Sequence, residues 1–202
     1  LDPTTGQRVN PFASYGTPKK GDFLYKDLNG DGVIDDNDKY AVGHGLAPRL
    51  TYGFSLGAEW NGFDFSCLFQ GNAGLQVYWQ DKFYMGYINY GDVINKEIAE
   101  GAWREGRTNA TYPRLLTGLN TLNAQPSDFW VQNKSYLRLK NVQIGYKIPK
   151  KLLQKLDISQ LRLYTSLENM LTFTSYKGID PEISGTTYPT MKQITVGVNV
   201  VF

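Results

Sequence analysis

The sequence predicts an all-β fold: an antiparallel transmembrane β-barrel, to which this chain supplies about five strands joined by long loops. Three observations predict this class. Five segments alternate apolar and polar residues with period 2, which is the pattern of half-exposed β-strands. The polar positions hold mainly Gly, Ser, Thr, Asn and Gln, which suit the wet interior of a barrel. No apolar run approaches the ~20 residues that a membrane helix needs.

The composition is that of a folded protein. The chain has 202 residues, of which 14% are aromatic and 20% charged, and its net charge is +2. A disordered chain would have few aromatic residues and a larger net charge. The balanced charge argues against a nucleic-acid-binding surface, so we expect no nucleic-acid partner. The single cysteine excludes an internal disulfide framework and a cysteine-rich zinc site.

The first two strands form the clearest hairpin. In residues 50–60 the even positions are apolar, and the odd positions are Thr, Gly, Ser, Gly and Glu. In residues 63–70 the odd positions are Phe or Cys. The dipeptide Asn61-Gly62 stands between them, and Asn-Gly between two alternating runs is the strongest short-range hairpin signal.

Three further strands are expected at residues 141–148, 161–171 and 193–202, because each alternates with the same period. Two short helices are expected between strands. One covers residues 92–103 with Asp92 as its N-cap, and the other covers residues 149–156, where Pro149 suits a first helical turn.

The alternation assigns strand residues to a lipid face or a lumen face. Bulky apolar side chains should face lipid, with aromatic residues near the strand ends. The expected lipid-facing residues are Tyr52, Phe54, Leu56, Phe65, Cys67, Phe69, Val196, Val198 and Val200. The expected lumen-facing residues are Thr51, Ser55, Asp64, Ser66, Gln193, Thr195 and Asn199. The alternative is a soluble β-sandwich or jelly roll, in which the first set would lie in a closed protein core.

Five strands cannot close a barrel, because the smallest outer-membrane barrels have about eight. An open sheet edge in lipid would leave backbone groups unpaired, at several kcal/mol each. We therefore expect the chain either to oligomerise or to be a fragment of a longer protein. The short links at residues 61–62 and 149–160 should lie on one rim, and the long loops, which include residues 27–38 and 71–135, on the other.

Residues 27–38 read DLNGDGVIDDND and carry the sharpest chemical motif of the chain. Calcium binds six to eight hard oxygen atoms, and oxygens at alternate positions of a curling loop point inward. Gly32 stands where such a loop must turn sharply. The expected cation ligands are Asp27, Asn29, Asp31, the Val33 carbonyl, Asp35 and Asp38.

The expected ion is Ca²⁺, with Mg²⁺ as an alternative. The last loop position is an aspartate instead of the bidentate glutamate of EF-hands, and no flanking helices are evident, so the loop resembles the dockerin type more than a sensor. The carboxylates of this loop repel one another unless they are neutralised. A cation would therefore staple an extracellular loop; the alternative is an Asp/Asn/Gly-rich surface turn with no ion.

The long loop of residues 71–135 is rich in Tyr and Trp. These rings combine an apolar face with a polar tip, which suits stacking on sugars or peptides. The candidate ligand-binding residues are Tyr78, Trp79, Tyr84, Tyr87, Trp103 and Trp130. The alternative is that the rings pack the loop onto itself or onto a partner.

Nothing in the sequence predicts an enzyme. It contains no G-x-S-x-G motif, phosphate-binding loop or dinucleotide fingerprint. The single histidine, His44, is expected to be a solvated loop residue. Cys67 has no partner histidine near in sequence, so we expect it to be buried or lipid-facing and not to be a nucleophile.

Several segments, taken in order, resemble one family. They are GDFLYKDLNGDGVIDDNDK, PRLTYGFSLGAEWNGFDFSCLFQGNAG, ATYPRLL, SDFW, SYLRLKNVQIGYKIP, LENMLTFTSYKGIDPE and the terminal GVNVVF. Together they resemble the C-terminal third of SusC/RagA-like outer-membrane transporters, the TonB-dependent importers of Bacteroidetes. The resemblance covers nearly the whole chain from about Gly21 onward.

The resemblance implies the last five strands of a 22-stranded barrel that crosses the outer membrane many times and contacts its lipid. Residues 1–49 would form an extracellular loop region that contains the acidic loop, and residues 50–202 the C-terminal strands. A SusD-like surface lipoprotein would cap the exterior. TonB would act through an N-terminal region and plug domain that are absent from this sequence.

The expected function is TonB-dependent import of oligosaccharides or oligopeptides across the outer membrane, as the barrel part of a SusCD-like complex. The rival hypothesis is a secreted, calcium-stabilised β-domain that binds carbohydrate. The rival predicts a charged outer face on the strands and solubility without detergent, so the two hypotheses are separable.

Overall fold

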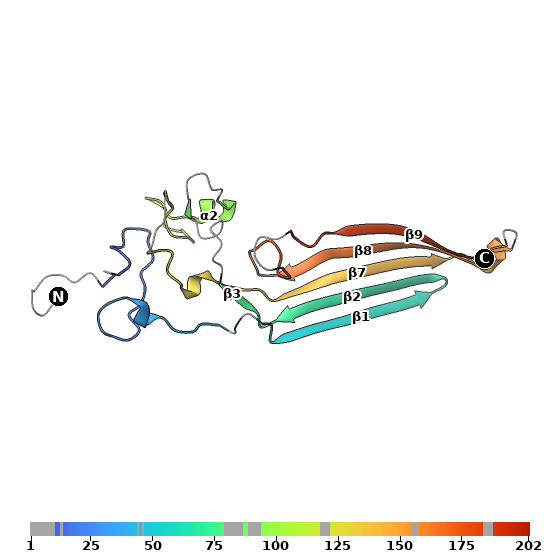
Figure 1. Cartoon of the computed structure of the whole chain (residues 1–202). Coiled ribbons are helices and arrows are strands. Elements are labelled where there is room, and N and C mark those ends of the chain that lie inside the picture. The colour runs from blue at the N-terminus through green and yellow to red at the C-terminus, as the bar shows by residue number, and fades with distance from the viewer. Residues whose placement is uncertain are drawn as a thin grey trace, which may run out of the picture. The chain divides into compact units, whose positions relative to one another are not determined.

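The computed structural model describes residues 11–12, 14–43, 45, 47–78, 87–88, 94–117, 122–154, 157–183 and 188–202. The chain divides into two compact units (Figure 1). The sheet unit consists of His44–Val77 and Gln132–Phe202. The loop unit consists of Leu1–Gly43 and Tyr78–Val131.

One antiparallel sheet dominates the sheet unit. Its strands are β1 (Leu50–Trp60), β2 (Phe63–Ala73), β7 (Tyr136–Lys147), β8 (Gln160–Thr174) and β9 (Gln193–Val201), and they lie side by side in the order β1-β2-β7-β8-β9. All four pairings are antiparallel. The predicted all-β class and the five strands are therefore confirmed.

The turn between β1 and β2 is formed by Asn61 and Gly62. Both residues have positive φ angles, 48° and 86°. Positive φ at both central residues defines the turn type whose twist matches that of paired strands, and Asn-Gly is the pair that adopts it most readily. The turn signal in the sequence thus gave the correct hairpin, with Trp60 opposite Phe63.

Strand β7 begins at Tyr136, earlier than the predicted start at residue 141. The register with β2 shifts between Leu68 and Phe69, which are partnered by Asn141 and Leu139. Lys140 is therefore an extra residue in β7, a β-bulge. Before the bulge the apolar residues are odd-numbered, Leu137 and Leu139, and after it they are even-numbered. Because the alternation changes phase at Lys140, the sequence pattern did not reveal the first half of the strand.

Both short connections lie at one end of the sheet. Trp60, Phe63, Tyr146, Leu163 and Val198 are successive register partners across the five strands. The turn at residues 61–62 and the β7–β8 link follow directly from this row, as the rim prediction requires. That link contains α3 (Lys150–Leu153), whose N-cap position is Pro149, within the predicted helix 149–156. Residues 155–156 lie outside the described residues.

The loop unit contains only short elements. These are η1 (Asp36–Asp38), β4 (Tyr87–Ile88), α2 (Lys96–Gly101), β5 (Leu116–Thr117) and η2 (Asp128–Trp130); β3 (Gln76–Tyr78) and β6 (Val131–Asn133) form a separate two-stranded sheet. Helix α2 is capped by Asn95, whose side chain accepts a hydrogen bond from the Glu97 amide at 2.8 Å. The N-cap is thus Asn95 and not the predicted Asp92, which lies outside the described residues. No helix among the described residues is long and apolar enough to cross a membrane.

Two small apolar cores hold the loop unit together. Ile98, Tyr112 and Trp130 form one core, and Phe12, Ile34 and Leu122 form the other. The side chain of Ile34 is buried at 5% exposure, so the acidic loop is anchored by an apolar residue at its eighth position.

A buried ion pair ties distant segments of the loop unit. Arg114 donates two hydrogen bonds to the Asp22 carboxylate, at 2.7 and 3.0 Å. Asn123 donates to the same carboxylate at 2.9 Å and accepts from the Phe23 amide. Burial raises the pKa of Asp22, but these hydrogen bonds outweigh burial and lower it below its usual value. A paired, charged carboxylate therefore joins segments about 100 residues apart.

Candidate functional site: the two faces of the sheet

The register gives the sheet one continuous apolar face. In an antiparallel pair, directly opposed residues share a face, and successive residues along a strand alternate between faces. Leu56, Cys67, Val142, Leu167 and Ile194 form one row of such partners. Neighbouring rows on this face are also apolar, from Phe54, Phe69, Leu139 and Leu171 to Trp60, Phe63, Tyr146, Leu163 and Val198.

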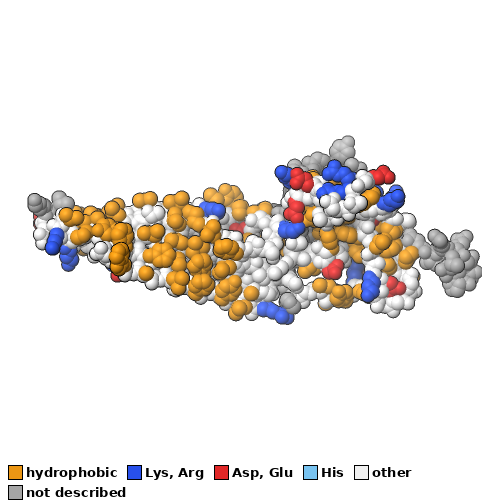
Figure 2. Space-filling view, turned by 180° about the vertical axis from the view of Figure 1, so that it is seen from behind, with side chains coloured by type: hydrophobic (Ala, Val, Ile, Leu, Met, Phe, Trp, Pro, Cys, Tyr) orange, Lys and Arg blue, Asp and Glu red, His pale blue; other side chains and the backbone are white. Residues whose placement is uncertain are grey.

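This apolar face is open. Val196, Ile194 and Leu56 are 77%, 67% and 57% exposed, and apolar side chains spread over the strands in Figure 2. A contiguous apolar surface of this kind marks a site of interaction with protein or membrane. The predicted division of residues between two faces is confirmed by the register, and no closed core forms on the apolar side within the described residues.

The opposite face is polar. One of its rows consists of Gly57, Ser66, Gln143, Ser166 and Thr195. All the predicted lumen-facing residues belong to this face, and their partners are mainly Gly, Ser, Asn and Gln. The sheet therefore has one apolar face and one polar face.

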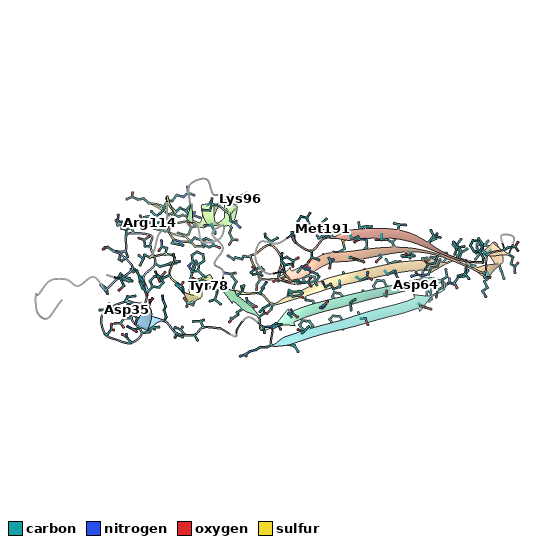
Figure 3. The ribbon with its side chains drawn as sticks, viewed as in Figure 1. Asp35, Asp64, Tyr78, Lys96, Arg114 and Met191 are labelled. Atoms are coloured by element: carbon teal, nitrogen blue, oxygen red, sulfur yellow. The ribbon has the colours of Figure 1, made fainter. Side chains whose placement is uncertain are left out.

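An ion pair lies on the polar face close to the turn end. Arg162 donates two hydrogen bonds to Asp64, the one from Nε at 2.9 Å, and a third to Gln143 at 3.2 Å. A Cβ on Gly145 would lie within 2.6 Å of both the guanidinium and the carboxylate. Gly145 thus leaves the space in which the pair lies flat on the sheet, near the end that Asp64 marks in Figure 3.

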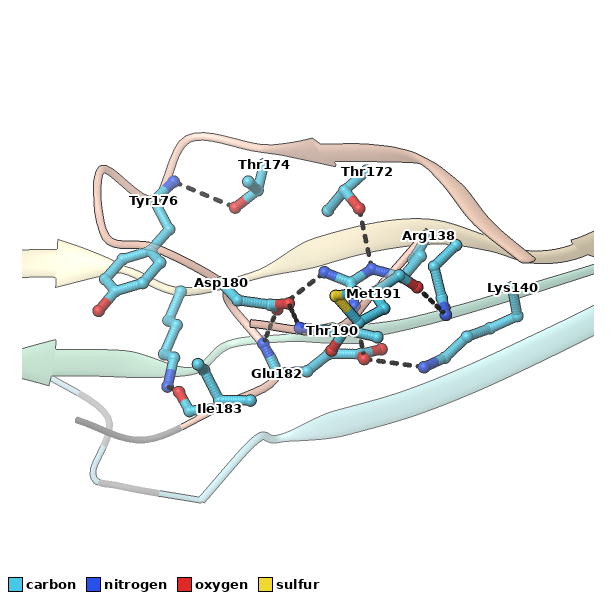
Figure 4. A network of polar contacts seen from close by, with 12 residues as sticks. Arg138, Lys140, Thr172, Thr174, Tyr176, Asp180, Glu182, Ile183, Thr190 and Met191 are labelled. Atoms are coloured by element: carbon cyan, nitrogen blue, oxygen red, sulfur yellow. Dashed lines mark hydrogen bonds and ion pairs between the residues drawn. The ribbon is translucent and has the colours of Figure 1, made fainter. Parts of the chain in front are cut away.

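A second charged cluster lies at the other end of the polar face (Figure 4). Arg138 of β7 donates to Asp180 at 2.8 Å, to Glu182 at 2.7 Å and to Thr172 at 2.8 Å. Lys140, the bulge residue, donates to Glu182 at 2.8 Å. Both acids come from the loop between β8 and β9, so this cluster joins that loop to the polar face of β7.

The cluster is buried, with Arg138 and Asp180 each 4% exposed. Burial raises the pKa of Asp180, but hydrogen bonds from Arg138 and from the Glu182 and Thr190 amides lower it to about 2. Asp180 is thus charged at neutral pH and paired. The sequence pattern did not single out Arg138, Lys140, Asp180 or Glu182. Arg138 and Lys140, two charged residues in alternation just before residue 142, would have been the signal for a charged cluster, but the phase change at the bulge concealed it.

The acidic loop of residues 27–38 curls around its own backbone amides. Asp27 accepts from Gly30 and Gly32 at 2.6 and 2.9 Å, and Asp31 accepts from Val33 at 2.8 Å. Asp38 accepts from Leu28 and Asp35, at 2.7 and 2.9 Å.

These hydrogen bonds lower the pKa of Asp38, the one from Asp35 most strongly. Asp35, labelled in Figure 3, caps η1 through Asn37. The residues that the structure describes include no group of three or more His, Cys, Asp or Glu side chains placed to hold a metal ion. Backbone amides donate to these carboxylates in this arrangement. The predicted cation stays a prediction.

The aromatic candidates have different outcomes. Trp130 is 1% exposed and packs in the core with Ile98 and Tyr112. The prediction that it binds ligand is therefore corrected: it is a core residue. Tyr78 is half-buried and packs against the same core, and Trp103 is half-buried with its ring against Gly21. Trp79 and Tyr84 lie outside the described residues, as does the side chain of Tyr87.

Known proteins resemble this chain, although no model of a protein family matches it. TonB-dependent receptor P3 of Formosa agariphila is 31% identical over an alignment of 203 residues that covers 93% of this chain and 20% of that protein. TonB-dependent receptor SusC of Bacteroides thetaiotaomicron is 27% identical over an alignment of 192 residues that covers 89% of this chain and 17% of SusC.

A solved structure agrees with these relatives. The RagAB peptide transporter superposes with a TM-score of 0.67 at 29% identity, over 84% of this chain and 19% of the matched chain. This chain thus spans about a fifth of the length of the proteins that it matches. Its sheet has the antiparallel order of a barrel wall, and the chain belongs to the SusC/RagA-like family of TonB-dependent receptors.

Proposed function

We propose that this chain forms part of the wall of an outer-membrane barrel that imports nutrients with energy from TonB. The observation that carries the proposal is the sheet itself. Its apolar face is continuous over five strands and exposed, and its other face is polar with paired charges. A lipid environment accounts for the first face, and a water-filled lumen for the second.

The rival hypothesis of a secreted, calcium-stabilised domain explains the sheet less well. A soluble domain would have to cover the apolar face with a second protein layer. In the described residues, Val196 and Val198 on this face remain 77% and 55% exposed.

The family supports the kind of transport. The matched RagAB structure is that of a peptide transporter. We propose oligopeptides or oligosaccharides as cargo and a SusD-like surface lipoprotein as partner. Growth of a deletion strain on defined peptides or glycans, with and without the restored gene, decides which cargo is imported.

A matched pair of substitutions tests the membrane orientation. Val196 lies on the apolar face and Thr195 on the polar face, at adjacent positions of β9. An arginine on the lipid face of a barrel costs about 2–4 kcal/mol near the membrane midplane, whereas lumen positions accept it. In the full-length protein, Val196→Arg should reduce the amount of folded protein in the outer membrane, and Thr195→Arg should not. Equal tolerance of both changes would contradict the orientation.

We also propose that Ca²⁺ binds the acidic loop through Asp27, Asn29, Asp31, Val33, Asp35 and Asp38. The alternating spacing of the oxygen-bearing residues and their mutual repulsion support this proposal. Calcium titration of the purified full-length protein by calorimetry should show one site that Asp31→Ala removes while the barrel stays folded. Absence of calcium-dependent heat in the unaltered protein would leave the loop as the amide-bonded turn described above.

A further inference from the structure

Two polar-face side chains of β7 are buried where the strand begins. Tyr136 and Arg138 are 5% and 4% exposed, whereas Lys147, at the other end of the same face of β7, is exposed. Something therefore covers the end at which β7 begins. The hydrogen-bond partners identify the cover as the described residues of the β8–β9 loop, 175–183 and 188–192, which we call the strap.

Both parts of the strap are attached. In the first part, Asp180 and Glu182 accept from Arg138, and the Ile183 carbonyl accepts from the buried Lys134. In the second part, the Thr190 amide donates to Asp180 at 3.0 Å, and the Met191 carbonyl accepts from Asn169 at 3.0 Å. Asp180 thus connects Arg138 with both parts of the strap.

We propose that the strap folds inward over the lumen face and narrows the barrel at its loop end, and that Arg138 is the latch that holds it there. The proposal rests on the proposed function, because a lumen exists only if the sheet is part of a barrel. The contacts of Asp180 and Glu182 run to Arg138 on the polar face, and that of Ile183 runs to Lys134 just before β7, so the strap lies on the face that would be the lumen side of the wall. Its exposed apolar residues, Ile179, Tyr188 and Met191, would then line the narrowed passage.

The latch is tested by amide hydrogen exchange on the full-length protein in detergent. Arg138→Met removes the charge at similar length. Arg162→Met is the matched control, because Arg162 also pairs with an aspartate on the same face but does not contact the strap. We expect the Glu182 and Thr190 amides to be protected, and to exchange at least about tenfold faster in Arg138→Met, with β7 and β8 unchanged. Arg162→Met should leave the strap protected.

Two results would overturn the latch. One is rapid exchange of the Glu182 and Thr190 amides in the unaltered protein, and the other is equal loosening of the strap by both arginine variants. If Arg138→Met fails to fold, Asp180→Asn removes the partner charge without a change in size and should loosen the strap in the same way.

The inward position is tested by labelling in whole cells. Met191→Cys, in a Cys67→Ala background, should react with a small water-soluble maleimide but at least about tenfold more slowly with a maleimide on a large polyethylene glycol chain. Adding Arg138→Met should remove most of this difference. Equally fast labelling by both reagents without the latch change would show an outward loop and overturn the narrowing.

Failure of the proposed function gives a different result. The unaltered protein would then lack the heat-dependent electrophoretic shift of a folded barrel, and the narrowing would be overturned together with the barrel. The exchange comparison of Arg138→Met with Arg162→Met would still decide whether Arg138 latches the strap.

Discussion

Asp180 shows at the scale of one residue how pairing overcomes burial. Its carboxyl loses hydration in the cluster, yet Arg138 and two backbone amides hold its pKa at about 2. A carboxyl whose pKa is lower in the folded state stabilises that state above its unfolded pKa, and the stabilisation disappears as the pH falls through the folded pKa. The stabilisation from Asp180 is therefore present at neutral pH.

We predict that the strap loosens only in strong acid. The pKa of Asp180 is lowered from 3.8 to about 2. This shift corresponds to about 2 kcal/mol of stabilisation of the folded state, which is lost as the pH falls from about 4 to about 2. Hydrogen exchange of residues 175–183, corrected for the intrinsic effect of pH, should show this step. Asp180→Asn should abolish the step, whereas Asp64→Asn should leave it; a step that persists without Asp180 would assign it to another group.

A second prediction concerns glycines in β1 and β2. A Cβ on Gly71 would overlap the carbonyl oxygen of Tyr136 and the ring of Tyr52, and a backbone atom cannot move aside easily. A Cβ on Gly57 would meet only the Phe65 carbonyl at 3.7 Å, an ordinary contact. Gly71→Ala should therefore destabilise the full-length barrel by about 1–3 kcal/mol, and Gly57→Ala by much less. Urea denaturation in detergent measures both, and equal effects would contradict the close packing at Gly71.

At the scale of elements, the bulge in β7 keeps the two faces intact. Lys140 adds one residue between Leu139 and Asn141, so Leu139 and Val142 both belong to the apolar face. The inserted residue, Lys140, also contacts the strap acid Glu182 beside Arg138. Lys140 thus keeps the apolar residues of β7 on one face and also contributes a hydrogen bond to the charged cluster.

The bulge predicts a contrast between two deletions. Removing Lys140 gives β7 regular alternation and a regular register with β2, and β8 already has a bulge opposite this position, so the full-length barrel should still fold and lose mainly the contact with Glu182. Removing Gln143 shifts Ile144 and Tyr146 to the polar face, because a slip of one residue exchanges the faces. Folded protein recovered from outer membranes should remain high for the first deletion and fall sharply for the second. The reverse order would refute the register.

The sequence predicted most of the sheet and little of the cluster that the strap forms. Alternation and the Asn-Gly turn gave β1, β2, β8 and β9 to within about three residues of their observed ends, since apolar residues keep one period along each of these strands. The start of β7 was missed because a bulge breaks the period. The Arg138 pairing with Asp180 could not be predicted, since long-range partners carry no local pattern. Trp130 was misjudged for a related reason: a residue's burial depends on segments far from it in the chain.

At the scale of the whole molecule, the sheet has two open edges. In the described residues β1 pairs only with β2, and β9 pairs only with β8. Unpaired edge groups in lipid cost several kcal/mol each. We predict that this chain expressed alone will not insert into lipid vesicles as a monomer, whereas the full-length protein will. Flotation with vesicles and heat-dependent electrophoretic migration check this, and a stable monomeric insert of the chain alone would contradict it.

The separate cores of the loop unit have a consequence for the order of assembly. Phe63 and Tyr146 are paired neighbours in the sheet although Tyr78–Val131, a segment of the other unit, stands between their strands in the chain. Closing a disordered connection costs entropy that grows with its length. If the intervening segment folds first around Ile98, Tyr112 and Trp130, the effective connection becomes shorter. The β1–β2 hairpin would then join β7 only after this segment has folded, so a core that contributes no residue to the sheet would set the rate at which the wall is completed.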